Sequence, residues 1–214
     1  MCRLLYVNSK KEFSISDYLI KFSEISKNSK EFQGHGWGCA YIKDGKWVYY
    51  KNVNPIWETE FPNFGISTRL IAHARSAFKD EGIIVENNMP FYDDKYNFIF
   101  NGQLSGVKIK EAGRIGAEKI FNYVKRFDKG SIKEAVEKGT EIIKKKSGFI
   151  RAMNIIITDS NSVYVYSHFN EDEEYFTMSS KLSDDLTLIC SDPFIGEDDW
   201  KTIRNNTLTE FKCF

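Results

Sequence analysis

MCRLLYV at residues 1–7 places a cysteine directly before an apolar run that is typical of a short strand starting at Arg3. If Met1 is removed, Cys2 carries both a thiol and a free α-amino group. An α-amino group titrates at about pH 7.7–8.0, so it can act as a general base near neutral pH. The segment therefore predicts a nucleophile that is activated by the amine of its own residue.

A cysteine after the first methionine is weak evidence on its own, and the hypothesis depends on four further segments. These are GHGWG at residues 34–38, AHARSA at 72–77, NNMPF at 87–91 and FNGQL at 100–104. Each has an ordinary structural explanation. Asn101-Gly102 is typical of a hairpin turn. Arg75 fits a surface ion pair, and His73 fits a core side chain, so we keep His73 out of the chemistry.

Composition limits the classes of function. The 214 residues are expected to form one domain, residues 1–214, with 42% apolar and 28% charged side chains. Thirty basic residues balance thirty acidic ones, which argues against a nucleic-acid partner. No apolar run approaches the ~18 residues of a membrane span, so no membrane partner is expected.

The cysteine pattern argues against a metal site. Cys2, Cys39, Cys190 and Cys213 are scattered, with no C-x-x-C pair. We therefore expect no metal and no cofactor, and we interpret the last three cysteines as small buried residues. The start of the chain lacks the apolar segment of a secretory signal. A cytoplasmic location with reduced thiols is expected.

Hydrophobic periodicity predicts the order of the elements. Expected strands are Arg3–Val7, Trp37–Ile42, Trp47–Lys51, Leu70–Arg75, Tyr96–Asn101, Ala152–Thr158, Ser162–Ser167, Tyr175–Ser179, Leu186–Cys190 and Thr207–Lys212. Expected helices are Ile15–Ile25, Ala112–Phe127 and Ser131–Lys146. Asp44-Gly45 predicts a hairpin between the second and third strands. A helix pair between two sets of strands indicates an α+β fold with antiparallel sheets, because a parallel sheet would need alternating strands and helices.

Taken together, these segments resemble the class II glutamine amidotransferases, which are N-terminal-nucleophile hydrolases. The resemblance covers most of the chain and is nearest to the small stand-alone branch of that family. The tail segment Cys190-Ser191-Asp192-Pro193, followed by Trp200, also fits that branch. The resemblance implies a four-layer αββα sandwich of two antiparallel sheets.

The resemblance also implies roles for particular residues. Cys2 is the expected nucleophile, which forms a γ-glutamyl thioester. Asn101 and Gly102 are the expected oxyanion hole, with the side-chain amide and the backbone N–H as its two donors. Arg75 matches the arginine that binds the α-carboxylate of the substrate, and a planar guanidinium suits that task.

Three positions depart from the family pattern. Phe100 stands where a histidine usually precedes Asn-Gly, and Ala77-Phe78 stands in place of the usual alanine-threonine pair. Gly116 replaces the aspartate that pairs with the α-ammonium of glutamine. Hydrogen bonds to charged groups contribute about 1.5–3 kcal/mol each, so this loss should weaken free glutamine binding by about tenfold to a few hundredfold. We therefore assign Arg75, Ala77, Phe78 and Gly116 to an altered substrate site.

Three functions remain open from the sequence. The leading hypothesis is an amidohydrolase that acts on glutamine or a γ-glutamyl compound and either releases ammonia for a separate partner protein or simply cleaves a small amide. The second is a non-catalytic binding or regulatory module of the same fold, which Phe78 and Gly116 favour. The third is a peptidase-like or acyltransferase relative that shares the nucleophile and differs in the acceptor.

Overall fold

The computed structural model describes residues 1–214 and contains two antiparallel sheets. The first sheet has the strand order β11-β9-β10-β1-β4-β2-β3. Its strands are β1 (Arg3–Ser14), β2 (Trp37–Lys43), β3 (Lys46–Asn52), β4 (Ile66–Ala74), β9 (Ser179–Leu182), β10 (Leu186–Cys190) and β11 (Lys201–Thr202). The second sheet has the order β12-β8-β7-β6-β5. Its strands are β5 (Phe91–Tyr92), β6 (Asn97–Ser105), β7 (Phe149–Thr158), β8 (Ser162–Ser167) and β12 (Thr207–Lys212).

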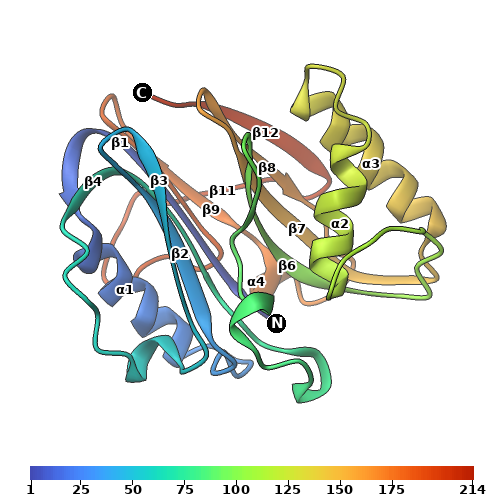
Figure 1. The fold of residues 1–214 in the computed structure, drawn as a ribbon, viewed down its shortest axis with the longest axis horizontal. Helices are drawn as coiled ribbons and strands as arrows, with labels where there is room; N and C mark the ends of the chain where they lie inside the picture. The colour runs from blue at the N-terminus through green and yellow to red at the C-terminus, as the bar shows by residue number, and fades with distance from the viewer.

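The helices form the two outer layers. α1 (Ile15–Lys27) lies on the outer face of the first sheet, and α2 (Gly116–Lys125) and α3 (Ile132–Lys146) lie on the outer face of the second (Figure 1). Short helical segments in the connections are α4 (Glu173–Phe176), η1 (Ile56–Glu58), η2 (Phe78–Asp80) and η3 (Val85–Asn87). The predicted αββα sandwich is confirmed.

Local chemistry accounts for the elements that the sequence predicted well. The Ser14 hydroxyl accepts a hydrogen bond from the Asp17 N–H at 3.3 Å and so caps α1. Leu19, Phe22 and Ile25 then lie one turn apart on the face that packs against the first sheet. Asp44-Gly45 forms the predicted hairpin turn, and both of its residues have positive φ angles.

The first half of strand β1 is buried on both faces, which explains its apolar run Leu4–Val7. Leu4 and Tyr6 face the core between the sheets, whereas Leu5 and Val7 face the core under α1. Because side chains alternate along a strand, Cys2 continues the row of Leu4 and Tyr6. The sequence pattern of β1 thus directs Cys2 toward the second sheet.

Several predicted elements differ in type or extent, and β1 runs to Ser14 rather than Val7. Residues 175–178 do not form a strand, because Asp172 adopts a positive φ of 50° and its carbonyl accepts the Tyr175 and Phe176 N–H groups, which makes the short helix α4; strand β9 begins only at Ser179. Helix α2 begins at Gly116 rather than Ala112. The chain is extended at Ile115, and Gly113 has a φ of 153°, so neither residue is helical.

Asn101-Gly102 is not a hairpin turn. Both residues lie inside β6, opposite Asn154 and Met153 of β7. Pairing with a strand about fifty residues away thus overrides the local turn preference of the dipeptide.

None of the helices is long and apolar enough to cross a membrane.

Candidate active site

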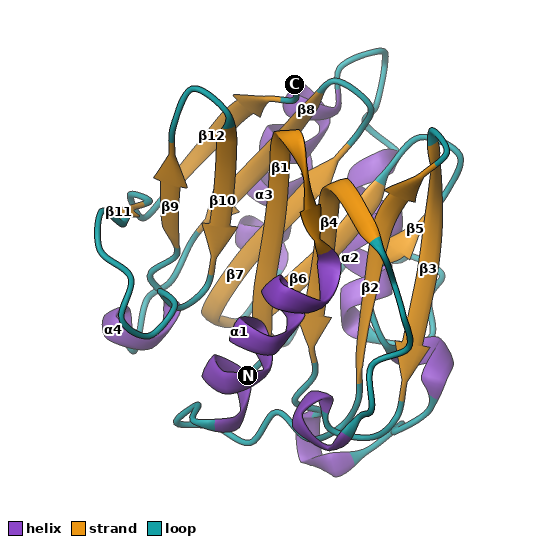
Figure 2. Cartoon of the chain, turned by 90° about the vertical axis from the view of Figure 1, so that its left-hand side faces the viewer, coloured by secondary structure: helices purple, strands orange, loops and turns teal.

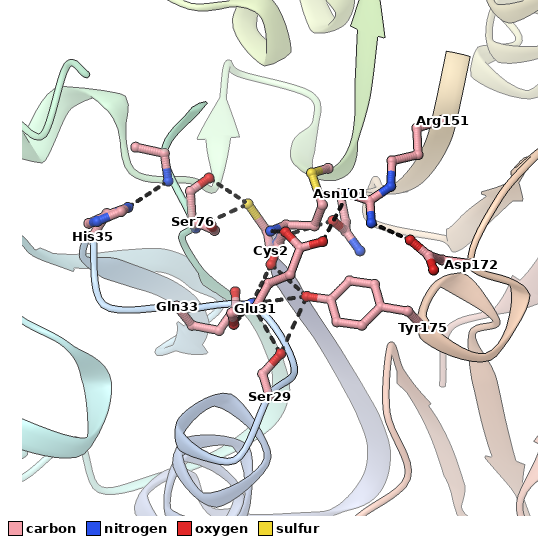
Figure 3. A network of polar contacts seen from close by, with 12 residues as sticks. Cys2, Ser29, Glu31, Gln33, His35, Ser76, Asn101, Arg151, Asp172 and Tyr175 are labelled. Atoms are coloured by element: carbon pink, nitrogen blue, oxygen red, sulfur yellow. Dashed lines mark hydrogen bonds and ion pairs between the residues drawn. The ribbon is translucent and has the colours of Figure 1, made fainter. Parts of the chain in front are cut away.

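Cys2 immediately precedes β1, close to the N-terminus that Figure 2 marks beside α1. Its backbone N–H donates to the Asn101 side-chain oxygen at 2.9 Å, and the residue is 8% exposed. On the other side, the Ser76 N–H donates to the Cys2 Sγ at 3.4 Å (Figure 3). The structure therefore brings together Cys2 and Asn101, which are 99 positions apart in the chain.

Residues from the C-terminal part of the chain hold this end of β1 in place. The Ser191 hydroxyl accepts from the Leu4 N–H at 2.9 Å, and Arg3 forms an ion pair of 2.8 Å with Asp192. The Arg3 guanidinium also lies 4.4 Å from the centre of the Tyr175 ring. The tail segment that the sequence resemblance singled out thus positions the residues that follow Cys2.

The Asn101 side chain carries a donor that no group in the chain uses. Asn101 is fully buried, its Oδ1 is bonded to the Cys2 nitrogen, and its Nδ2 has no hydrogen-bond partner. A buried amide without a partner costs about 1–3 kcal/mol of stability. An unsatisfied donor beside a buried thiol is the arrangement that stabilises a negatively charged oxygen.

The backbone N–H of Gly102 faces the same open edge of the second sheet. Met153, opposite Gly102, donates its own N–H to His168 on the β8 side at 2.7 Å. The pair Gly102–Met153 is therefore not hydrogen-bonded, and the Gly102 N–H points away from β7. On that edge β5 pairs with β6 only as far as Phe98. The Gly102 N–H therefore lies beyond the end of β5.

Glycine is required at position 102 by close packing. A Cβ atom there would lie 2.2 Å from the Ala152 carbonyl oxygen and 2.7 Å from the Phe100 ring. Phe100 itself is 6% exposed and belongs to the core. The ring that replaces the usual histidine therefore packs over the Asn101-Gly102 backbone and has no proton to exchange.

Arg75 is a buried cation without an acidic partner. Its guanidinium donates to the carbonyl oxygens of Gly82 at 2.9 Å and Glu81 at 3.4 Å, and the residue is 4% exposed. No acidic side chain of the chain forms an ion pair with Arg75. Arg75 directly follows β4 and is next to Ser76 in the sequence. Burial lowers the pKa of Arg75 from its ordinary value. A carboxylate ligand would supply the missing acidic partner and would raise the pKa of Arg75 again.

The other residues that were predicted to bind substrate, Ala77, Phe78 and Gly116, have three different environments. The Ala77 N–H donates to His35 Nδ1 at 2.8 Å, which ties it to the Arg75 loop. Phe78 is 65% exposed and makes no aromatic pair, while Lys79 lies over its ring. A Cβ at Gly116 would meet no atom within 4 Å, so the first turn of α2 leaves open space there.

Comparison with solved structures places this arrangement among known folds. The glutamine phosphoribosylpyrophosphate amidotransferase of B. subtilis superposes with a TM-score of 0.65 at 14% identity, over 99% of this chain and 49% of that one. A predicted glutamine amidotransferase from Pseudomonas aeruginosa gives 0.60 at 15% identity, over 99% and 97% of the two chains. A glutamine aminotransferase class-II domain protein from Silicibacter pomeroyi gives 0.61 at 15% identity, over 99% of each.

This chain has the class II glutamine amidotransferase fold. It spans about half the length of the B. subtilis enzyme and nearly the whole of the other two chains. No family model matches its sequence, and no curated protein sequence matches it. In this chain the start of β1 and the middle of β6 meet between the sheets, where Cys2 and Asn101 are found.

Burial raises the pKa of the Cys2 thiol above its ordinary value. The positive charges of the N-terminus and Arg75 and the Ser76 N–H act in the opposite direction but do not outweigh burial. The thiol is therefore neutral near pH 7, and it needs a base before it can attack a carbonyl group.

Sequence reasoning missed the residues that surround Met1. The Met1 ammonium binds the Glu31 carboxylate, and the Met1 carbonyl accepts from the Gln33 side-chain amide and from the Tyr175 hydroxyl at 2.8 Å. Glu31, Gln33 and Tyr175 lie beside Cys2, across from Ser76 (Figure 3). They come from a connection after α1 and from α4, so no spacing in the sequence links them. No group of three or more His, Cys, Asp or Glu side chains that could hold a metal ion is found.

His73 is fully buried on β4, and it gives the fold a dependence on pH. Burial, reinforced by the Arg75 charge, lowers the pKa of His73 to about 3 from its ordinary value of 6.5. Between these values the unfolded chain binds a proton that the folded chain does not, so stability rises with pH in that window. The contribution is complete above pH 6.5 and is lost progressively as the pH falls toward 3.

We expect a His73→Leu variant to lose less stability than the parent chain when the pH is lowered from 7 to 5. The full effect is about 1.4 kcal/mol for each pH unit below the unfolded pKa, because one proton is taken up on unfolding. Urea unfolding midpoints of both proteins at pH 5, 6 and 7 measure the difference. Parallel profiles for the two proteins would contradict the assignment.

Proposed function

We propose that the protein is an amidohydrolase that cleaves glutamine or a γ-glutamyl-type amide with Cys2, after removal of Met1, through a thioester. The observation that carries this proposal is the unpartnered Nδ2 of Asn101 beside the buried thiol. The Gly102 N–H, which points away from β7 on the same sheet edge, is the proposed second donor of an oxyanion hole. The structural neighbours, which are described as glutamine amidotransferases or as a glutamine aminotransferase class-II domain protein, agree with this chemistry.

The reaction follows from the positions of these groups. The Cys2 amine takes the thiol proton, and Sγ attacks the amide carbon while the carbonyl oxygen becomes an oxyanion at Asn101 and Gly102. The intermediate collapses when the C–N bond breaks and the Cys2 ammonium returns the proton to the leaving nitrogen. Water then attacks the thioester, with the same amine as its base, and releases the carboxylic acid and the free thiol.

Two residues constrain the substrate: Arg75, which is present as a cation, and Gly116, which stands where an acidic residue is missing. Arg75 has no acidic partner and can bind the carboxylate of a glutamyl group. Gly116 provides no carboxylate for an α-ammonium, so free L-glutamine lacks one of its usual contacts. We therefore favour a donor in which the glutamyl carboxylate matters more than the ammonium, such as a γ-glutamyl compound.

The proposal extends to the domain organisation, the partner protein and the cellular location. Residues 1–214 form the catalytic unit, and ammonia that is not lost to solvent is passed to a separate partner protein. The four cysteines are free, which suits a cytoplasmic enzyme whose thiols are kept reduced.

The competing function is a non-catalytic binding module of the same fold. Its support is the altered substrate site, where Phe78 is exposed and Gly116 provides no carboxylate. A chain that permanently keeps Met1 would have a neutral buried thiol and no α-amine on Cys2 to take the thiol proton.

Mass spectrometry separates the two functions. We expect the purified protein to lack the mass of methionine and to gain one adduct on Cys2 when it is treated with an electrophilic glutamine analogue. The Arg75→Met variant should be labelled much more slowly, because the carboxylate of the analogue loses its partner. Protein that keeps Met1 in the cell and takes no label would favour the binding module. Protein without Met1 that resists the analogue, yet hydrolyses other amides, would point to a different acyl donor.

A further inference from the structure

Met1 is bound by groups that match each part of an α-amino acid. Its ammonium pairs with Glu31, and its carbonyl oxygen accepts from Gln33 and from Tyr175. Its side chain packs against the apolar cluster of Ala152, Phe169, Tyr175 and Phe176. These residues, with Glu31 and Gln33, form the Met1 site.

Contacts within the rest of the chain hold the polar groups of the Met1 site. The Glu31 carboxylate also accepts from Arg151 at 2.8 Å, and Arg151 in turn pairs with Asp172. Gln33 is fully buried and donates to the Tyr175 hydroxyl at 3.0 Å. Removal of Met1 therefore leaves these partners ordered and aimed at the vacated space, with Arg151 fixing the carboxylate.

The charge on Glu31 suits a cationic ligand. Burial raises its pKa, but the hydrogen bonds and charges of the Met1 ammonium and Arg151 outweigh burial and hold the pKa below its usual value. Arg151 remains after processing and continues to favour the carboxylate form. The side chain is 28% exposed, so a small ligand can reach it.

We propose that the Met1 site, once Met1 is removed, binds a free L-amino acid with an unbranched apolar side chain, and that this ligand inhibits the enzyme reversibly. The inference rests on the proposed removal of Met1. The ligand repeats the contacts of Met1 through its ammonium, one carboxylate oxygen and its side chain. Its second carboxylate oxygen lies where the peptide bond to Cys2 was, beside the new Cys2 amine.

Inhibition follows from that last contact. A carboxylate next to the Cys2 amine stabilises its protonated form, and an ammonium cannot take the proton of the thiol. Cys2 is therefore a weaker nucleophile while the ligand is bound.

Calorimetry with L-methionine tests the site directly. We use protein that starts at Cys2, obtained by cleaving an N-terminal fusion, and we expect saturable binding of one L-methionine per chain. D-Methionine and L-glutamate should bind much more weakly, because they misplace the side chain or bring a charge to the apolar cluster. Protein that retains Met1 should bind no L-methionine.

Matched variants assign the binding to the Met1 site. Glu31→Gln should weaken L-methionine binding by about tenfold or more, because it removes the partner of the ammonium. Glu197→Gln is the control, since Glu197 is similarly exposed and pairs with two lysines of its own. If Glu31→Gln does not fold, as judged by thermal melting, Tyr175→Phe removes one donor to the ligand oxygen and serves in its place.

The outcomes separate this inference from the proposed function. Amide hydrolysis by protein without Met1 that shows no L-methionine binding would overturn the inference and leave the hydrolase intact. L-Methionine binding without hydrolysis of any amide would support the Met1 site and count against the hydrolase. Binding that Glu31→Gln and Glu197→Gln affect equally would place the ligand elsewhere and also overturn the inference.

Discussion

Replacing Cys2 with alanine should abolish amide hydrolysis, with a loss of about 10⁴-fold or more in kcat/KM, because the nucleophile is removed. The residue is small, it is 8% exposed, and its nitrogen can keep its hydrogen bond to Asn101, so the fold should persist. Ammonia release from glutamine and from γ-glutamyl amides measures the loss. Trapping with hydroxylamine reports on the thioester and would reveal an acyltransferase.

The matched control is Cys213→Ala. Cys213 is also a free thiol, but it lies after β12 and contacts the Tyr6 hydroxyl at 3.2 Å rather than Asn101. This variant should keep full hydrolytic activity. Unchanged activity in the Cys2→Ala variant would exclude the hydrolase and leave the binding module as the better explanation.

The second large effect is expected for Asn101→Ala. Loss of one oxyanion donor lowers kcat by about 10²–10³-fold, because the interaction exists only when the carbonyl oxygen carries charge. KM should change little, since the ground-state amide gains little from the same donor. Steady-state kinetics on the best amide donor, with the two constants resolved, measure this separation.

Asn101 also holds the Cys2 nitrogen, and a second variant separates the two roles. Asn101→Asp keeps an oxygen that can bind the Cys2 nitrogen, replaces the Nδ2 donor by a second carboxylate oxygen and adds a negative charge. It should therefore show at least as large a loss in kcat with Cys2 still in place, because the carboxylate also repels the oxyanion. A variant that retains most of its activity would mean that Asn101 is a structural residue and that the oxyanion is bound elsewhere.

Elements with local causes could be predicted well from the sequence. The Asp44-Gly45 turn, the Ser14 cap and the apolar stripe of α1 depend on residues within one or two turns of each other. The apolar run Leu4–Val7 likewise indicated a strand at the start of the chain. Such signals explain why the order of the elements could be predicted, whereas the four-layer arrangement was implied by the family resemblance.

Errors occurred where distant pairing or an unusual backbone conformation decides the structure. Asn101-Gly102 has the composition of a turn, but pairing with β7 makes it part of a strand. Tyr175 has the pattern of a strand residue, yet the left-handed conformation of Asp172 and hydrogen bonds to its carbonyl place Tyr175 in α4. Single-residue propensities express neither effect, because one depends on a distant strand and the other on the backbone angles of a neighbouring residue.

The sequence by itself determined the thiol beside the N-terminus, the alternation that directs Cys2 toward the second sheet, and the glycine that allows β6 to approach Ala152. Only the tertiary structure decided which groups surround the thiol. The Asn101 donor, the isolated Arg75 cation and the Met1 site are formed by segments that meet when the two sheets stack. Stacking is driven by apolar burial, which is non-directional, so polar neighbours emerge from the packing of the whole chain and from no local pattern.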